Sequence, residues 1–263
     1  MRLPSLLLFW IIMNWERGKV EKLVIVIPAY NEEENIENVV ISWHKVAEEI
    51  DKLGYESQLL IVDDGSTDHT FEVLSKLSKD RSLLKTITKD NQGHGATLLY
   101  GYKYALEEGA TWIFQTDSDG QTLASEFWDF WKCRDEYDMV IGNRTKREDG
   151  ISRIIVTKIL KLVIWSCFGV WVTDANTPFR LMRREWIEES LKFIPNDYNL
   201  TNVILSVICE KRKLRVKYIP ITFLQRQGGI NSINIAKITK IGIKALKDFV
   251  LINRNINREI ETK

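Results

Sequence analysis

The chain has few cysteines, no excess of one charge and no long apolar run, and each absence argues against a class of protein. Its 263 residues contain three cysteines, Cys133, Cys167 and Cys209, which are widely spaced and form no CxxC or Cys/His ligand pattern. This favours a reduced, cytoplasmic protein with buried thiols. Lys plus Arg number 37 against 36 Asp plus Glu, so the net charge gives no reason to expect nucleic acid as a partner.

Residues 1–20 form an apolar extension that is too short to span a membrane. Its apolar run extends from Leu6 to Met13, far less than the roughly 20 residues of a spanning helix, and no small-residue cleavage site follows, which argues against a signal peptide. Two interpretations stay open: an interfacial helix anchored by Trp10 and Trp15, or a true start nearer Met13. No other segment is long and apolar enough to span a bilayer, so we expect the protein at most to lie on one.

Apolar runs alternate with helical segments about five times in the first half of the chain. The runs predict strands over 22–28, 58–62, 83–88, 111–116 and 138–144. We expect one helix from Asn31 and a second capped by Ser66 or Thr67. This alternation indicates an α/β fold with a Rossmann-like, mainly parallel sheet and helices on both faces. Ligands bind at the carboxyl ends of strands in such sheets, where the motifs PAYNE, DDGS, DSDGQ and GNR all fall.

The second half contains segments whose helical period mixes apolar residues with cations. Residues 151–169 place Lys158 and Lys161 among Ile, Leu, Val and Trp, and a helix at 199–210 and strand-like residues 215–224 follow. A final helix from about Asn234 carries a basic stripe of Lys237, Lys240, Lys244 and Lys247. Both basic helices suit a surface of anionic lipid, and equally a helix that packs on the core with solvated lysines. No repeat or linker interrupts the chain, so we predict one domain over 21–263, with halves 21–145 and 146–263.

The segment DSDGQ places three side-chain oxygen donors, Asp117, Asp119 and Gln121, directly after a buried strand. Oxygen ligands favour Mg²⁺ or Mn²⁺ over zinc, and such a cation takes its remaining oxygens from water and a diphosphate. A turn without a metal is the other interpretation, because Asp-Gly and Ser-Asp are ordinary turn residues. Asp63 and Asp64 at another strand end favour the cation, since two acidic strand ends would otherwise repel each other.

Other phosphate-binding motifs are imperfect or missing. Gly93, Gly95 and Gly101 do not have the spacing of GxGxxG, and no GxxxxGK[ST] occurs. His94 lies in the same loop, where a histidine is more often a hydrogen-bonding residue than a general base. Arg144 directly follows a strand end, where a guanidinium can bind phosphate oxygens bidentately, so we expect it to contact a ligand phosphate.

Six segments together resemble a known family: VIPAYNEEENI, LLIVDDGSTDHT, NQGHGATLLYGYKYALEEG, DSDGQ, GNR and DANTPFRLMRRE. Their order makes residues 22–247 similar to family 2 glycosyltransferases of the GT-A fold, and within them to the dolichol- or polyprenol-phosphate sugar (mannose or glucose) transferases. The resemblance implies a metal-dependent, inverting hexosyltransferase of glycan biosynthesis. The resemblance implies that its donor is a nucleotide diphosphate-sugar and that its cofactor is Mg²⁺ or Mn²⁺. It also implies a peripheral protein on the cytoplasmic face of a membrane.

The resemblance also implies roles for individual residues. It assigns the metal to Asp117, Asp119 and Gln121. It assigns donor contacts to Pro28, Ala29, Tyr30, Glu32, Val62, Asp63, Asp64, Ser118, Arg144 and Arg226. Arg153 is the nearest counterpart of the arginine that holds the acceptor phosphate, and we expect Arg147 beside it. Asp119, Asp174 and Arg144 are the expected catalytic residues, with 21–145 as the nucleotide-sugar half and 146–263 as the acceptor and membrane half.

The acceptor decides whether a general base is needed. A lipid monophosphate has its second pKa near about 6 and arrives largely ionised, whereas an alcohol must lose its proton to a positioned group, for which Asp174 is the candidate. The family pattern D-x-TSGFR is replaced here by Asp174 and ANTPFR, and no Lys follows Arg226 where the family has one. We favour a polyprenyl (dolichyl or undecaprenyl) phosphate. A glycan or other alcohol acceptor in cell-surface polysaccharide synthesis, and a non-catalytic nucleotide-sugar-binding subunit, stay open, as do the sugar, the base and the oligomeric state.

Overall fold

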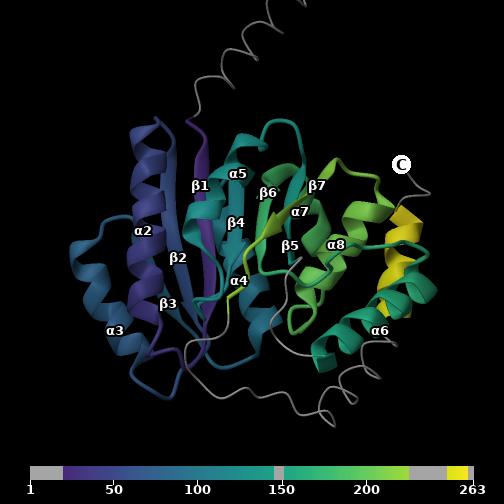
Figure 1. The fold of residues 1–263 in the computed structure, drawn as a ribbon, viewed down its shortest axis with the longest axis horizontal. Helices are drawn as coiled ribbons and strands as arrows, with labels where there is room; N and C mark the ends of the chain where they lie inside the picture. The colour runs from purple at the N-terminus through teal and green to yellow at the C-terminus, as the bar shows by residue number, and fades with distance from the viewer. Residues whose placement is uncertain (1–19, 145–150, 225–247, 260–263) are drawn as a thin grey trace, which may run out of the picture.

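The computed structural model describes residues 20–144, 151–224 and 248–259, which form an α/β fold with helices on both faces of one sheet (Figure 1). The sheet has seven strands in the order β3-β2-β1-β4-β6-β5-β7. The strands are β1 (Lys22–Ala29), β2 (Glu56–Asp63), β3 (Leu84–Thr88), β4 (Trp112–Thr116), β5 (Met139–Arg144), β6 (Phe179–Arg183) and β7 (Val216–Ile221). The helices are α2 (Ile36–Lys52), α3 (Thr70–Leu77), α4 (His94–Glu107), α5 (Phe127–Lys132), α6 (Ile151–Phe168), α7 (Arg184–Ser190) and α8 (Thr201–Lys211), with a further helical segment at 248–259.

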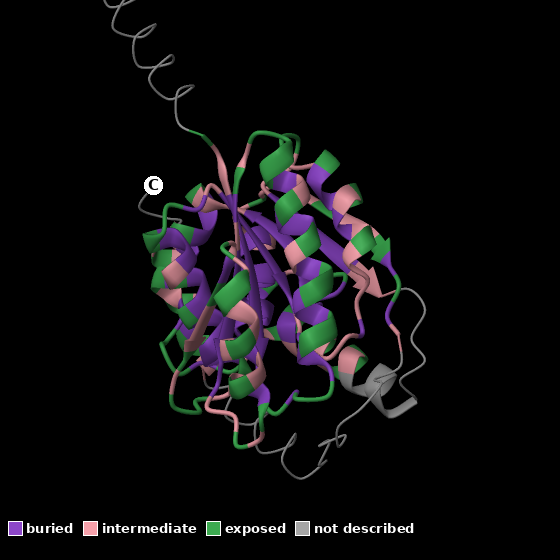
Figure 2. Cartoon of the chain, turned by 90° about the vertical axis from the view of Figure 1, so that its left-hand side faces the viewer, coloured by how far each residue is buried: buried purple, intermediate pink, exposed green. Residues whose placement is uncertain are grey.

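The central strands are buried on both faces, as their continuous apolar runs predict. Alternate side chains of β1 point to opposite sides of the sheet, so Leu23 and Ile25 pack with α2 and α5, whereas Val24 and Val26 pack with α4 and α8. Figure 2 shows this buried centre between the exposed outer surfaces of the helices. Each such fully buried aliphatic side chain stabilises the fold by about 1.5 to 3 kcal/mol. The mainly parallel α/β fold expected from the alternation is confirmed.

One strand of the sheet runs antiparallel and was not expected. β1 pairs parallel with β2 and β4, β2 with β3, and β5 with β7, but β6 pairs antiparallel with both β4 and β5. The segment FRLMR is short and contains two arginines, so its pattern does not indicate a buried strand. β6 therefore separates β4, which leads into Asp117, from β5, which ends at Arg144.

The helix α2 begins at Ile36 and not at Asn31. Asn31 has φ +54°, in the left-handed region that asparagine tolerates better than most residues. The carbonyl of Glu32 accepts the amides of Asn35 and Ile36, each at 2.9 Å. The chain therefore makes a turn over 31–35 before the helix, even though the acidic run in this segment resembles a first helical turn.

The helix α3 begins at Thr70, so neither Ser66 nor Thr67 caps it. The hydroxyl of Ser66 donates to Asp63 instead, and the amide of Thr67 donates to Oδ1 of Asn31 at 2.8 Å. The first bond holds Ser66 to the end of β2, and the second ties the loop after β2 to the loop after β1. The helix therefore starts several residues later than its sequence suggests.

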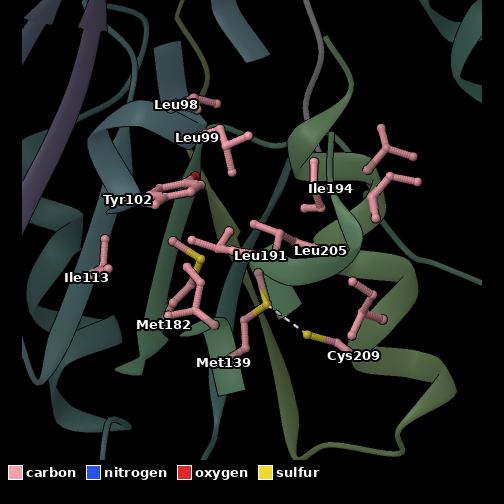
Figure 3. Packing of buried hydrophobic residues seen from close by; sticks show 14 of the residues in the cluster. Leu98, Leu99, Tyr102, Ile113, Met139, Met182, Leu191, Ile194, Leu205 and Cys209 are labelled. Carbon is pink, nitrogen blue, oxygen red and sulfur yellow. Dashed lines mark hydrogen bonds between the residues drawn. The ribbon is translucent and has the colours of Figure 1, made fainter. Parts of the chain in front are cut away.

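The thiols are free, but not all of them are buried. Cys209 is buried on α8, where its Sγ lies 3.3 Å from Sδ of Met139 (Figure 3). Burial raises the pKa of the Cys209 thiol, which makes it unreactive. Cys133 and Cys167 are half-buried, so the expectation of buried thiols is correct for Cys209 alone.

The chain after β5 covers one end of the sheet. Ile164 and Phe168 of α6 are buried in the core shared with α8, and the ring of Phe168 contacts Phe249 of the 248–259 helix at 5.1 Å between centroids. Within the described ranges, no helix is long and apolar enough to cross a membrane. The basic stripe expected over 237–247 lies outside the described residues.

Candidate functional site

The carboxyl ends of β1, β2 and β4 meet at one edge of the sheet. Parallel pairing sets Ala29 opposite Asp63, and the amide of Asp64 donates to the carbonyl of Ala29 at 2.8 Å. β4, which ends at Thr116, is the other neighbour of β1. The donor contacts expected over 28–32 and 62–64 and the DSDGQ segment therefore lie along a single edge.

The residues expected to contact the nucleotide differ widely in exposure. Tyr30 is 46% exposed, whereas Glu32 is 7% exposed and its Oε2 accepts a hydrogen bond from the side-chain amide of Asn35 at 2.9 Å. Val62 is 0% exposed and lies in the core cluster shared with α4. Pro28 and Ala29 are also buried. Tyr30 is thus the member of this set that is best placed to stack on a base, and the other contacts stay predictions.

Asp63 and Asp64 both bind neighbouring loops. The Asp63 carboxylate accepts the hydroxyl of Thr88 at 2.7 Å. Asp64 forms an ion pair with Lys89 and accepts the amide of Gly93 at 2.9 Å. Burial raises the pKa of Asp64, but its hydrogen bonds, the strongest from Lys89, outweigh this and hold the pKa below its usual range. In this structure the two carboxylates shape the loop that leads from β3 into α4.

The DSDGQ segment forms a tight turn after β4. Oδ1 of Asp117 accepts the side-chain amide of Gln115 at 3.2 Å and lies 3.0 Å from Nε2 of His94. Oδ1 of Asp119 accepts the amide of Gln121 at 3.1 Å, across Gly120, whose φ of +70° requires a residue without a Cβ for an unstrained turn. Ser118, expected to flank the diphosphate, is 5% exposed.

Gln121 connects this turn to the chain that follows β7. Its Nε2 donates to the carbonyl of Leu224 at 2.6 Å, and the amide of Leu224 donates to the carbonyl of Gln121 at 2.8 Å. Because the side-chain nitrogen donates to Leu224, the side-chain oxygen is the atom through which Gln121 would act as a ligand. The bond is compatible with that predicted role.

The charges around Asp117 favour a cation. Burial lowers the pKa of the half-exposed His94, but the charge and hydrogen bond of Asp117, with the charges of Asp119 and Asp64, outweigh it, so the pKa is raised. The same field would stabilise a metal ion, and the oxygen donors of Asp117, Asp119 and Gln121 suit Mg²⁺ or Mn²⁺. Among the residues described, no three His, Cys, Asp or Glu side chains form a metal cluster. Diphosphate and water oxygens would therefore have to complete the coordination.

Arg144 and Asp174, which were expected to act separately, form a bidentate ion pair. Nε of Arg144 donates to Oδ2 of Asp174 at 3.0 Å, and Nη2 donates to Oδ1 at 2.8 Å. Their side chains are 13% and 5% exposed, and the guanidinium also lies 5.2 Å from the ring centroid of Phe223. In this structure Asp174 therefore orients Arg144. Its role as a general base stays a prediction.

A cationic pocket lies between the end of β5 and α6. It has a volume of about 200 Å³ and is lined by Asn143, Arg144, Thr157, Lys158, Lys161, Thr173 and Asp174. Three of these residues are cations and one is an acid, so the pocket is set up for an anion. Lys158 and Lys161 were not predicted as site residues, although their three-residue spacing places them on one side of the helix.

Three expected phosphate contacts lie wholly or partly outside the described residues. Arg147 and Arg226 lie outside the described residues, and for Arg153 only the helical backbone of α6 is described. Sequence reasoning also missed Asn202, which contacts Gln115 beneath the DSDGQ turn. Its only signal was a polar residue in an otherwise apolar helical segment.

Comparison with known proteins identifies one family whose sequence model this chain matches. The model of the family described as glycosyl transferase family 2 matches residues 24–191. The undecaprenyl-phosphate 4-deoxy-4-formamido-L-arabinose transferase of Salmonella paratyphi B is 26% identical over 181 residues, which is 68% of this chain and 54% of that protein. The Salmonella newport protein of the same name has the same identity and coverage. The match thus spans about half the length of these curated relatives.

Solved structures share the fold at low sequence identity. Glucosyl-3-phosphoglycerate synthase from Mycobacterium tuberculosis, crystallised with Mn²⁺, UDP and glucosyl-3-phosphoglycerate, has a TM-score of 0.62 at 15% identity, with 96% of this chain and 86% of that chain covered. Mannosyl-3-phosphoglycerate synthase from Rubrobacter xylanophilus has a TM-score of 0.61 at 14% identity, with 93% and 77% covered. At this level of identity, these similarities show that the fold is shared.

Proposed function

The chain belongs to glycosyl transferase family 2, and we propose that it transfers a sugar from a nucleotide diphosphate-sugar to a polyprenyl phosphate at a membrane surface. The pocket beside α6 carries this proposal. Arg144, Lys158 and Lys161 line it, and the same helix presents apolar side chains to solvent. A lipid monophosphate has the matching chemistry, with an anionic head on an apolar chain.

The apolar surface next to the pocket is formed by Ile159, Leu162, Trp165 and Trp171, which are 55%, 57%, 50% and 59% exposed. The first three recur every three residues along α6. The rings of Trp165 and Trp171 stack with centroids 6.0 Å apart. Tryptophans favour the membrane–water interface. We infer that this surface lies on the membrane and that the protein is peripheral on the cytoplasmic face.

The donor side of the proposed reaction uses the edge formed by β1, β2 and β4. Asp117, Asp119 and Gln121 would hold a Mg²⁺ or Mn²⁺ ion, which supplies positive charge that stabilises the leaving diphosphate. Tyr30 would stack on the base. Arg144, held by Asp174, would add two N–H donors for a phosphate. We treat 21–145 as the nucleotide-sugar half and 146–263 as the acceptor half of one domain.

The acceptor side needs no general base if the acceptor is a lipid phosphate, because its oxygen is already ionised at neutral pH. Lys158 and Lys161 would hold that phosphate, in addition to the predicted Arg147 and Arg153. Transfer to an alcohol would instead require Asp174 to leave Arg144 and accept a proton. The bidentate pair with Arg144 is therefore easier to reconcile with a phosphate acceptor. Attack from the side opposite the diphosphate would invert the anomeric carbon.

A transfer assay with matched acceptors tests the proposal. The chain is incubated with Mn²⁺, labelled UDP-, GDP- or dTDP-sugars, and either undecaprenyl phosphate or undecaprenol. We expect label in the phosphate arm alone. The variant K158A/K161A should raise the KM for undecaprenyl phosphate by about 100-fold or more, since each charge-assisted hydrogen bond contributes about 1.5 to 3 kcal/mol and the loss of two costs at least about 3 kcal/mol. Lys132→Ala, at an exposed lysine of α5 paired with Asp129, is the control and should change nothing.

Two outcomes would favour the alternatives. Label in the undecaprenol arm would support an alcohol acceptor, with Asp174 as the base. No transfer in any arm, with the wild type indistinguishable from Asp119→Ala, would support a non-catalytic subunit that binds nucleotide sugars.

A further inference from the structure

A row of polar side chains crosses the core beneath the DSDGQ turn. It consists of Gln115 on β4, Asn202 on α8 and Tyr102 on α4, which are 0%, 2% and 0% exposed. Figure 3 shows Tyr102 beside Leu99 among the apolar residues of this core. Polar groups this deeply buried are costly unless each finds a hydrogen-bond partner.

The three side chains form one chain of hydrogen bonds that ends at Asp117. The Tyr102 hydroxyl donates to Oδ1 of Asn202 at 3.1 Å, Nδ2 of Asn202 donates to Oε1 of Gln115 at 3.1 Å, and Nε2 of Gln115 donates to Oδ1 of Asp117 at 3.2 Å. An ionised carboxylate can only accept, so Gln115 must turn its nitrogen to Asp117. Its oxygen then requires the nitrogen of Asn202, whose oxygen requires the tyrosine hydroxyl.

The Tyr102 hydroxyl, at the far end of this hydrogen-bond chain, always acts as a donor. Burial raises the pKa of Tyr102, so its hydroxyl keeps its proton at neutral pH. The direction of every bond in the chain is therefore determined at both ends, by a group that donates and a group that accepts.

Asn202 is also held through its backbone. Arg180, fully buried on β6, lies directly opposite Gln115 in the strand pairing. Its Nη1 donates to the carbonyl of Asn202 at 3.1 Å, and its Nε donates to the carbonyl of Thr177 at 3.0 Å. The central residue of the chain is thus linked by hydrogen bonds to β4, β6 and α4 at once, which leaves its side-chain amide little freedom to rotate.

We propose that Gln115, Asn202 and Tyr102 are positioning residues that orient the Asp117 carboxylate toward a divalent cation. The inference rests on the proposed function only in that Asp117 is taken as a cation ligand. Gln115 and His94 both contact Oδ1 of Asp117, so the position of that oxygen is restrained before a metal arrives. Hydrogen-bond partners of a metal-binding side chain raise the affinity for the metal because they hold that side chain in its binding orientation.

A purely structural role is the competing interpretation, in which the three residues merely satisfy one another. It predicts that their loss lowers stability without a separate effect on the cation. Gln115 follows Ile113 and Phe114 on a fully buried strand, so an apolar side chain of similar length would pack there. The two roles can therefore be separated by substitution.

Mn²⁺ binding in the presence of UDP or GDP, measured by the loss of the free-ion EPR signal, tests the inference on the full chain. We expect Gln115→Met to weaken Mn²⁺ binding about 10-fold, and Tyr102→Phe, two residues further from Asp117, to weaken it about 2- to 5-fold. The control is Gln58→Met, the same change on β2, which β1 separates from β4, and it should leave the affinity as in the wild type. Thermal unfolding in EDTA checks that each variant is folded.

Several results would overturn the inference. One is a folded Gln115→Met protein that binds Mn²⁺ within twofold of the wild type. Another is a loss of affinity that is equally large in Gln58→Met. If Gln115→Met does not fold, the test rests on Tyr102→Phe. Unchanged Mn²⁺ affinity in that variant would refute the positioning role of the hydrogen-bond chain. Mn²⁺ binding requires no acceptor, so a wild type that binds Mn²⁺ but transfers nothing to lipid phosphate refutes the proposed acceptor and leaves this inference standing. A wild type that binds no Mn²⁺ with either nucleotide refutes the inference itself.

Discussion

Replacement of Trp165 and Trp171 by serine is expected to detach the protein from anionic vesicles. The two residues are 50% and 59% exposed, and with about 250 Å² for each tryptophan they present roughly 270 Å² of surface to solvent. If half of that area enters the interface, at about 25 cal/mol per Å² the pair contributes about 3 kcal/mol to membrane binding. The double variant should therefore partition roughly 100-fold more weakly.

The assay is co-sedimentation with vesicles of phosphatidylcholine alone or with anionic lipid added. Leu53→Ser is the control, because Leu53 is as exposed as Trp171, at 59%, and follows α2 on the other face of the sheet. Binding should also be stronger with anionic lipid and weaken with salt, since Lys158 and Lys161 flank the apolar surface and each basic residue near such a membrane contributes about 1 kcal/mol.

Equal partitioning of the wild type and the tryptophan variant would refute this reasoning. Because the two rings stack on each other, thermal unfolding of the variant is needed to show that the protein is intact. A folded variant that still binds vesicles would mean that the exposed side of α6 is not the membrane contact.

Two further predictions concern charged residues of the site. Arg144→Met and Asp174→Asn should each lower the free energy of unfolding by about 3 kcal/mol, because each leaves its buried partner uncompensated. The double variant should lose less than the sum in denaturant unfolding, and strictly additive losses would contradict the coupling. The folded-state pKa of Asp64 lies below its ordinary value of 3.8, so the stability that this carboxylate contributes is present above about pH 4 and is lost as the pH falls toward the lowered value. Asp64→Asn should flatten the fall in unfolding free energy as the pH drops below about 4, and a fall as steep as in the wild type would count against this assignment.

The parts of the fold with local signals were predictable. β1, β2 and β4 are continuous apolar runs that end in polar residues, and this pattern arises because a parallel strand is buried on both faces. β6 was missed because its arginine at 180 contradicts a buried strand. That guanidinium is satisfied by the carbonyls of Ala175, Thr177 and Asn202, and nothing in the sequence brings these groups together.

The candidate site was likewise predictable only where a local sequence signal marks it. DSDGQ could be located from its five letters, since its oxygen donors follow one strand. The pairing of Arg144 with Asp174 and the position of Lys158 beside them depend on how α6 lies across the end of β5. That arrangement results from tertiary packing, which residue spacing alone does not encode.

The bond between Gln121 and Leu224 has a consequence for biosynthesis. The two residues are 103 positions apart in the chain, and Asn202, which supports Gln115, follows it by 87. On the ribosome, the acidic turn therefore emerges long before the residues that hold it. A nascent chain that ends short of residue 202 contains both aspartates but lacks their supports. The edge of the sheet can therefore become competent for its ligand only after residues 202 and 224 have been synthesised, which links ligand binding there to completion of the sheet.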